Sequence, residues 1–197
     1  MVIGMAGGIG SGKSTVLAML REHYDVWICM ADELGHRAMD QGTASYESIV
    51  KEFGCSVLRK DGTIDRNVLA DLVYGDSGRL AALNDIVHPY VRREIRRLIR
   101  QCPPERVFVL ESAILFETGC DVLCDEVWGV ITEDEIRIRR LMEGRGYSRD
   151  KAAGIMKCQM SNRELAGRCD RLLVNDSDED ELLRQIHKFW ENMLENR

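Results

Sequence analysis

Short apolar runs alternate with helical patterns along the chain, from its first residues to its last helix. The runs that we expect to form strands lie at residues 2–6, 26–30, 106–110, 126–131 and 171–174. They read as continuous apolar stretches rather than alternating ones, which is typical of parallel strands that helices cover on both faces. The pattern therefore predicts an α/β fold, a three-layer core with a doubly wound, parallel five-stranded sheet.

Polar residues mark where several of the helices begin. Residues suited to capping stand before three helical patterns: Asp65, Ser148, and Thr132, which is paired with Glu135 in a capping box. An apolar stripe from Leu182 to Leu194 keeps the 3.6-residue period of a helix that packs against the sheet. His88 precedes Pro89, which favours an extended or turn conformation rather than a helix at that point.

Helical patterns without a confident strand fill one long segment, from about residue 41 to 104. We interpret this segment as a helical insertion between the second and third strands of a single domain, whose core then comprises about residues 1–40 and 105–197. Residues 133–165 are expected to form a helical lid, because a glycine-flanked turn at 144–146 provides a hinge.

Composition and charge exclude several classes of protein. The chain has 27 basic and 33 acidic side chains and a net charge of −6, which argues against a nucleic-acid binder. Its apolar runs fall short of the ~18 residues of a membrane span, and its amino end lacks the pattern of a secretory signal. We therefore expect a cytoplasmic protein without a membrane partner, and a monomer is compatible with this composition. The cysteines, seven in number, form no C-x-x-C pair, which favours reduced thiols over disulfides or a zinc site.

A glycine-rich segment follows the first predicted strand. Residues 7–14 read Gly-Gly-Ile-Gly-Ser-Gly-Lys-Ser, which fits the phosphate-loop pattern G-x-x-x-x-G-K-[ST] between a strand and a helix. In such a loop the backbone N–H groups converge on an anion, and the start of the helix adds partial positive charge. Lys13 is expected to contact the β- and γ-phosphates, and the Ser14 hydroxyl to bind Mg²⁺. The residues that we expect to bind ATP here are Gly8, Gly10, Ser11, Gly12, Lys13, Ser14 and Thr15.

Two classes of phosphate-loop protein compete at this point, a small-molecule kinase and a nucleotide-hydrolysing switch or motor. The chain has no N-K-x-D stretch for reading guanine, and the match of residues 32–35 to D-x-x-G is a weak pattern. A short core, a helical insertion and an arginine-rich late helix provide what a kinase needs, an acceptor pocket and cations that close over the phosphates. We interpret the chain as a kinase, with another nucleoside or nucleotide kinase and a slow NTPase switch as alternatives.

Two carboxylates are expected beyond the carboxyl ends of strands, where ligands bind to parallel sheets. Asp32 follows the second strand, and there it can accept the proton of an attacking hydroxyl or hold Mg²⁺ through water. The alternative role of Asp32 is to cap the following helix. Glu111 ends the third strand, where it lies near the metal or caps the next turn.

Segments spread over nearly the whole chain share a known pattern. They are Gly7–Thr15, Ala31–Asp32, Asp61–Thr63, Leu83–Pro89, Leu115–Glu117, Gln159, Asp170 and Val174–Asn175. In their order and spacing these segments resemble the dephospho-CoA kinase family. Many kinases share the phosphate loop, whereas the Asn-x-x-x-His-Pro stretch at 84–89 and the Ala-Asp pair before a helix narrow the match.

The resemblance implies an activity and several residue roles. It implies transfer of the γ-phosphate of ATP, with Mg²⁺, to the ribose 3′-hydroxyl of dephospho-CoA, the last step of coenzyme A biosynthesis. It also implies a parallel-sheet core, a helical CoA domain and a mobile lid. Asp32 matches the family's general base, and His88 falls in the segment associated with the acceptor. Arg140 matches a lid arginine that stabilises charge on the phosphates, and Asn175 falls in the loop near adenine.

The chain departs from the family pattern in three places. Met30 stands where a first acid is usual, and the segment that begins at Glu111 keeps a carboxylate but lacks a proline. Gly144 stands where a second lid arginine is common, and Arg145 can take that role at a different angle.

An arginine-rich face is expected on the helix that follows Pro89. Its members are Arg92, Arg93, Arg96, Arg97 and Arg100. A solvated helix face is the default interpretation of such a row. Our sharper hypothesis is that Arg92 or Arg93 meets the phosphate groups of the acceptor, because arginine forks match phosphate oxygens.

Overall fold

The computed structural model describes residues 1–195. Its contacts divide the chain into two compact units. The first unit contains Met1–Cys29 and the chain from Cys102 onward, and the second contains Met30–Gln101. No helix of the described residues combines the length and the apolar character that crossing a bilayer requires.

A five-stranded sheet lies at the centre of the first unit. Its strands are β1 (Val2–Ala6), β2 (Val26–Met30), β3 (Val107–Glu111), β4 (Glu126–Ile131) and β5 (Arg171–Val174). Their order is β2-β3-β1-β4-β5, and β1 pairs in parallel with both β3 and β4, as β4 does with β5. The predicted parallel five-stranded sheet is therefore confirmed. β1 lies where the strand order reverses, so the loop that follows it opens at the point where parallel sheets bind ligands.

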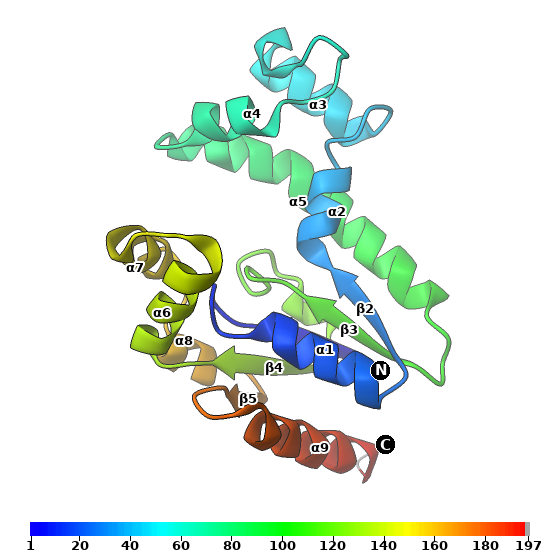
Figure 1. Cartoon of the computed structure of the whole chain (residues 1–197). Coiled ribbons are helices and arrows are strands. Elements are labelled where there is room, and N and C mark those ends of the chain that lie inside the picture. Colours follow the sequence, from blue (N-terminus) through cyan, green and yellow to red (C-terminus); the bar gives the residue numbers. More distant parts are fainter. Residues whose placement is uncertain (196–197) are drawn as a thin grey trace. The chain divides into compact units, whose positions relative to one another are not determined.

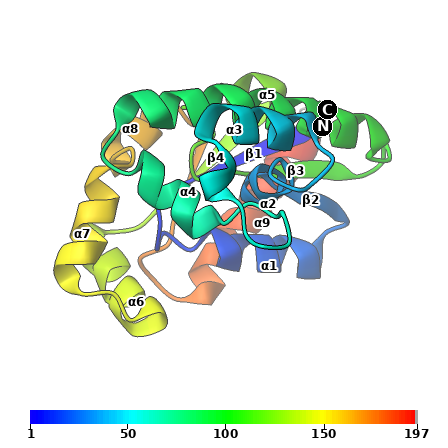
Figure 2. The same cartoon turned by 90° about the horizontal axis from the view of Figure 1, so that it is seen from above.

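Helices cover both faces of this sheet. They are α1 (Lys13–His23), α6 (Asp134–Arg145), α7 (Arg149–Lys157), α8 (Asn162–Ala166) and α9 (Glu179–Glu195), with a 3₁₀ turn η2 (Asp121–Leu123). α1 and α9 pack side by side on one face, α8 contacts β4 from the other, and α6 packs against α7 (Figures 1 and 2). The core between them consists of large buried side chains such as Ile3, Met5, Leu20, Leu110, Trp128 and Leu173.

The last helix buries most of its predicted stripe. Leu182, Ile186, Trp190 and Met193 are buried at the 3.6-residue spacing that the sequence predicts. The prediction that Leu194 packs against the sheet is wrong, because 49% of its surface is exposed. It lies next to Met193 in the last turn, and the direction of that turn leaves only one of the two side chains facing the core.

The second unit is built of helices. They are α2 (Ala31–Arg37), α3 (Ala44–Phe53), α4 (Arg66–Val73) and α5 (Ser77–Gln101), with a 3₁₀ turn η1 (Cys55–Val57). α2, α3 and α4 all contact the long helix α5, and Figure 2 shows α3 and α4 lying along it. Asp65 caps α4 as predicted, because its side chain accepts hydrogen bonds from the N–H groups of Asn67 and Val68.

The expectation of a break at His88 and Pro89 is wrong. Both residues lie inside the continuous helix α5, which runs for 25 residues. A proline within a helix supplies no N–H group and crowds the preceding turn. Val87, Val91 and Ile95 are buried on the face that α5 turns to the rest of its unit, and we infer that this packing outweighs the local preference.

Two of the expected helix starts in the first unit differ in outcome. Ser148 caps α7 as predicted, because its hydroxyl accepts a hydrogen bond from the N–H of Lys151. The capping box at Thr132 is wrong, because α6 begins at Asp134 and Glu133 is its N-cap. Thr132 lies at the end of β4, where its buried hydroxyl bonds backbone carbonyls of neighbouring segments instead. A capping box does form two helices later, between Ser161, the N-cap of α8, and Glu164.

Candidate active site

The loop between β1 and α1 takes the conformation of a phosphate-binding turn. Gly10 and Gly12 have φ values of +78° and +94°, a region that side chains with a Cβ rarely adopt. Gly12 is the N-cap of α1, and its carbonyl accepts hydrogen bonds from the N–H groups of Thr15 and Val16. The first turn of α1 therefore opens directly onto the loop, which gives an anion both backbone N–H donors and the positive end of the helix dipole.

Lys13 lies across the mouth of this loop. Its Nζ donates a hydrogen bond of 2.8 Å to the carbonyl of Gly7 and lies 3.4 Å from Oε1 of Glu111. The two charged side chains are largely buried, with 11% and 7% of their surfaces exposed. Glu111 is the last residue of β3, the parallel neighbour of β1, which explains why its carboxylate reaches the loop. Ser112, the next residue, also caps the following turn, because its hydroxyl accepts a hydrogen bond from the N–H of Ile114.

The ends of β4 and β5 hold the other wall of the loop. Thr132 Oγ1 and Asn175 Nδ2 each donate a hydrogen bond of 2.9 Å to the carbonyl of Ser11. Both residues are buried, and Asn175 directly follows β5. A Cβ on Gly12 would lie 1.9 Å from Asn175 Nδ2, so the amide occupies the space that a side chain at residue 12 would need.

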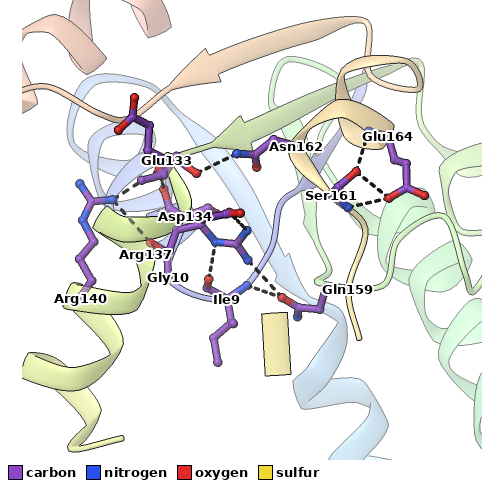
Figure 3. Close-up of polar contacts among 12 residues, drawn as sticks. Ile9, Gly10, Glu133, Asp134, Arg137, Arg140, Gln159, Ser161, Asn162 and Glu164 are labelled. Atoms are coloured by element: carbon purple, nitrogen blue, oxygen red, sulfur yellow. Dashed lines mark hydrogen bonds and ion pairs between the residues drawn. The ribbon is translucent and has the colours of Figure 1, made fainter. Parts of the chain in front are cut away.

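Arg140 of α6 also contacts backbone carbonyls around the loop. Its Nη2 donates to the carbonyl of Asn175 at 3.1 Å, and its Nη1 lies 3.5 Å from both the Gly10 carbonyl and Thr132 Oγ1. The guanidinium is half-buried and lies beside the loop (Figure 3). A positive charge held in this position can meet the oxygens of a phosphate bound in the loop.

Sequence reasoning gave no role to two side chains that contact the loop. Arg137 of α6 donates from Nε to the carbonyl of Ile9 at 3.0 Å, and Gln159, just past α7, accepts from the N–H of Ile9 at 2.8 Å (Figure 3). Arg137 is only 3% exposed. Burial lowers the pKa of its guanidinium, and the nearby carboxylate of Asp134 opposes that shift. A helical pattern that places Arg137 one turn before Leu141, a core position, was the signal available for this burial.

The remaining loop hydroxyls differ in their surroundings. Ser14 is exposed at the second residue of α1, and Thr15 is half-buried behind it. The hydroxyl of Ser11 is buried, and no group within residues 1–195 forms a hydrogen bond with it. The loop thus keeps polar hydroxyl groups that the folded chain itself does not use.

The residue set fits a magnesium ion that is held mainly by a nucleotide. Mg²⁺ prefers oxygen ligands and usually binds through one or two protein groups together with substrate phosphates. Ser14 supplies an exposed hydroxyl at the loop, and Glu111 a carboxylate beside Lys13. The described residues contain no cluster of three or more histidine, cysteine or acidic side chains suited to an all-protein metal cage.

Three predicted site residues lie in the second unit. Asp32 is exposed at the second position of α2, and its side chain makes no capping hydrogen bond, because Met30 is the N-cap of that helix. The predicted alternative of a cap is therefore wrong for Asp32. His88 and Arg92 lie one turn apart on α5, and both are half-buried. Burial lowers the pKa of His88, and the charge of Arg92 lowers it further, against a smaller opposite effect of Asp85.

Arg93 stands apart from His88 and Arg92. It is exposed, lies 3.7 Å from the carboxylate of Glu94, and places its guanidinium 5.1 Å from the centre of the Tyr90 ring. The first unit, by contrast, brings together the seven predicted phosphate-loop residues with Arg140 and Asn175.

Comparison with known proteins points to one family. The family model described as Dephospho-CoA kinase matches residues 1–181. The chain is 42% identical over 191 residues to the dephospho-CoA kinase of Symbiobacterium thermophilum, which covers 96% of this chain and 80% of that protein. It is 35% identical over 198 residues to the dephospho-CoA kinase of Carboxydothermus hydrogenoformans, with 97% and 96% of the two chains covered.

Solved structures share the fold over nearly the full length. The protein TT1252 from Thermus thermophilus superposes with a TM-score of 0.87 at 32% identity and covers 98% of this chain and 97% of its own. The dephospho-CoA kinase from Campylobacter jejuni superposes with a TM-score of 0.73 at 22% identity, with 98% and 96% covered, and supports the fold alone.

Proposed function

The chain belongs to the dephospho-CoA kinase family, whose reaction is the final step of coenzyme A biosynthesis, and we propose how its own residues perform that reaction. In this proposal ATP binds with its phosphates in the loop between β1 and α1, and its γ-phosphoryl group passes to the ribose 3′-hydroxyl of dephospho-CoA. The observation that supports it best is the buried Lys13, held between the Gly7 carbonyl and Glu111 at the start of a helix. A cation fixed at a nest of N–H groups suits a triphosphate.

The charge of the transferring phosphoryl group needs stabilisation in the transition state. We assign this role to Lys13 and Arg140, because the Lys13 ammonium lies across the loop mouth and the Arg140 guanidinium lies beside Gly10. Asn175 supports ATP binding by holding the Ser11 carbonyl and by accepting from Arg140.

Mg²⁺ would be held by the Ser14 hydroxyl together with ATP oxygens, and when bound it neutralises negative charge on the β- and γ-phosphates. Glu111 is placed in our proposal to keep Lys13 oriented beside that site rather than to bind the metal directly.

The acceptor is activated, in this proposal, by Asp32. Its carboxylate is exposed in the first turn of α2, directly after β2, and the carboxyl ends of parallel strands are where ligands bind. Asp32 orients the 3′-hydroxyl and accepts its proton as the oxygen attacks the γ-phosphorus. His88 and Arg92 form one face of α5 that binds the acceptor, with Arg92 meeting a phosphate group.

An acceptor panel tests the activity. The protein is incubated with ATP and Mg²⁺ and with dephospho-CoA, with nucleoside monophosphates or with no acceptor, and ADP is followed. Formation of ADP only with dephospho-CoA is the expected result. Release of ADP without any acceptor favours an NTPase switch, and release with a nucleoside monophosphate favours a different kinase.

Two substitutions test the residue roles. Lys13→Ala and Asp32→Asn are each expected to lower kcat by about 10²-fold or more while the protein stays folded. Glu33→Gln is the matched control for Asp32→Asn, because Glu33 is the next residue of α2 and is also exposed. Near-normal kcat in Asp32→Asn would remove Asp32 as the base. A cytoplasmic location, a monomeric state and motion of residues 133–165 as a lid stay predictions.

A further inference from the structure

Ile9, in the middle of the phosphate loop, is held at three points. Its N–H donates to Oε1 of Gln159 at 2.8 Å, and its carbonyl accepts from Nε of Arg137 at 3.0 Å. Its side chain packs against a buried cluster that α6 and α7 form from Ile138, Leu141 and Ala152. Both backbone polar groups of one loop residue are thus bonded by side chains from outside the loop (Figure 3).

Arg137 is an unusual residue to find in this position. Its side chain is 3% exposed, and Asp134, with which it forms an ion pair at 3.4 Å, is itself 71% exposed. Burying a charge carries a large free-energy cost unless specific bonds compensate it. The bonds of the guanidinium point to the loop, because Nε bonds Ile9 and Nη2 lies 3.5 Å from the Gln159 oxygen that also receives the Ile9 N–H.

The glycine at residue 8 matches this arrangement. A Cβ added to Gly8 would lie 2.1 Å from Nη2 of Arg137 and 3.0 Å from Oε1 of Gln159. Gly8 does not have a positive φ, so its backbone conformation does not require glycine. The guanidinium instead occupies the space of a side chain at residue 8, which brings Arg137 into direct contact with the loop backbone.

We propose that Arg137 and Gln159 are positioning residues for ATP, which act by fixing the backbone of Ile9. With Ile9 held, the other N–H groups of the loop keep one orientation toward the phosphates, so ATP binding does not have to order them. The same two bonds join α6 and the end of α7 to the loop. This inference rests on the proposed function only in taking ATP as the nucleotide.

Four single variants and one double variant test the proposal in the full-length protein. Arg137→Met and Gln159→Leu remove the two bonds to Ile9. Gln159→Glu keeps an acceptor for the Ile9 N–H and places a carboxylate beside Arg137. Arg139→Met is the matched control, because Arg139 lies two residues from Arg137 on α6 but is exposed. The Kd for ATP with Mg²⁺ is measured by titration calorimetry without acceptor, alongside the KM for each substrate and the Tm.

The expected result is a selective loss of ATP affinity. Arg137→Met and Gln159→Leu each raise the Kd for ATP about tenfold or more, the size of a lost hydrogen bond to a charged or buried group. The KM for dephospho-CoA stays within about twofold, and Gln159→Glu and Arg139→Met bind ATP like the parent. Because both side chains act on Ile9, the double variant Arg137→Met/Gln159→Leu loses less affinity than the product of the two single losses.

Two results would overturn the proposal. The first is an unchanged Kd for ATP in both single variants. The second is an equal weakening for ATP and dephospho-CoA that follows a fall in Tm, which is what a purely structural role produces. If Arg137→Met does not fold, the comparison of Gln159→Leu with Gln159→Glu decides alone. If the parent protein forms no acceptor-dependent ADP, the proposed function fails, but the Kd for ATP still reports on Ile9.

Discussion

The hydroxyl of Thr132 provides a sharp test of how the phosphate loop is held. Thr132 is fully buried at the end of β4, and its Oγ1 lies 2.9 Å from the Ser11 carbonyl and 3.3 Å from the Asn175 carbonyl. Thr132→Val replaces the hydroxyl with a methyl group of similar shape. The change therefore removes hydrogen bonds and leaves the packing almost intact.

The free-energy cost of Thr132→Val depends on which carbonyl acceptors keep a hydrogen-bond donor. In Thr132→Val the Ser11 carbonyl retains Asn175 Nδ2 at 2.9 Å, and the Asn175 carbonyl retains Arg140 Nη2 at 3.1 Å. Neither carbonyl is left without a donor, so the cost is that of a net hydrogen bond, about 1 kcal/mol, rather than the larger penalty of a buried unsatisfied group. Thr132→Ala also loses a buried methyl group and is expected to cost about 2 kcal/mol.

Urea unfolding followed by circular dichroism measures these costs. A shift of the midpoint with an unchanged m-value reports the change in free energy of unfolding. Thr132→Ser keeps the hydroxyl and serves as the control for the lost methyl group. Because Arg140 keeps its bond to the Asn175 carbonyl, kcat of Thr132→Val is expected to fall by less than about tenfold. A cost above about 3 kcal/mol would refute the reasoning, because it would mean that Asn175 and Arg140 do not satisfy the two carbonyls.

Three further predictions concern other parts of the chain. Gly129→Ala in β4 places a Cβ 2.8 Å from Cys169 Sγ, so it should lower the free energy of unfolding by about 1–3 kcal/mol. Adding Cys169→Ala to the same chain should restore part of that loss, and full stability of Gly129→Ala alone would contradict the prediction. Burial and the charge of Arg92 hold the pKa of His88 below its usual 6.5, so the folded protein binds fewer protons than the unfolded chain, and its stability should fall as the pH drops below 6.5. In urea titrations His88→Gln should lose less stability over that pH range, and the same pH dependence of stability in both proteins would contradict this prediction. Burial raises the pKa of Cys124 to about 12, so its thiol should stay unmodified by iodoacetamide at pH 8 while the exposed Cys55 is alkylated. Peptide mass mapping measures the modification, and equal labelling of the two cysteines would contradict the prediction.

The strands and the loop were predictable because their signals are local. Each predicted strand is a continuous apolar run next to polar or glycine residues, and four of the five agree with the observed bounds, while β3 begins and ends one residue later than predicted. The loop pattern at residues 7–14 depends on spacing alone, since glycine and lysine are required by the geometry of an anion nest.

The errors arise where tertiary packing decides. Pro89 favours a break by its own chemistry, and the buried face of α5 keeps the helix continuous through it. Thr132 has the sequence pattern of a capping residue, but it stands at the end of a central strand, where two buried carbonyls compete for its hydroxyl. Arg137 has the sequence pattern of a solvated helix residue, and its burial depends on the loop 128 residues earlier in the chain. The spacing from Arg137 to Leu141 indicates a buried helix face, but it does not reveal the distant loop residue that Arg137 contacts.

The geometry of the candidate site is distributed over the strand ends rather than contained in the glycine-rich pattern. Glu111 ends β3, and Thr132 and Asn175 directly follow β4 and β5. Each of these three polar side chains bonds the loop or its lysine. β3 and β4 pair with β1, and β5 pairs with β4. Because parallel strands end at the same edge of a sheet, this register places the three residues at the edge where the loop begins. A substitution that shifts this register would move the loop's supports together, even with residues 7–14 unchanged. We therefore expect ATP affinity to depend on these three residues as well as on the loop sequence itself.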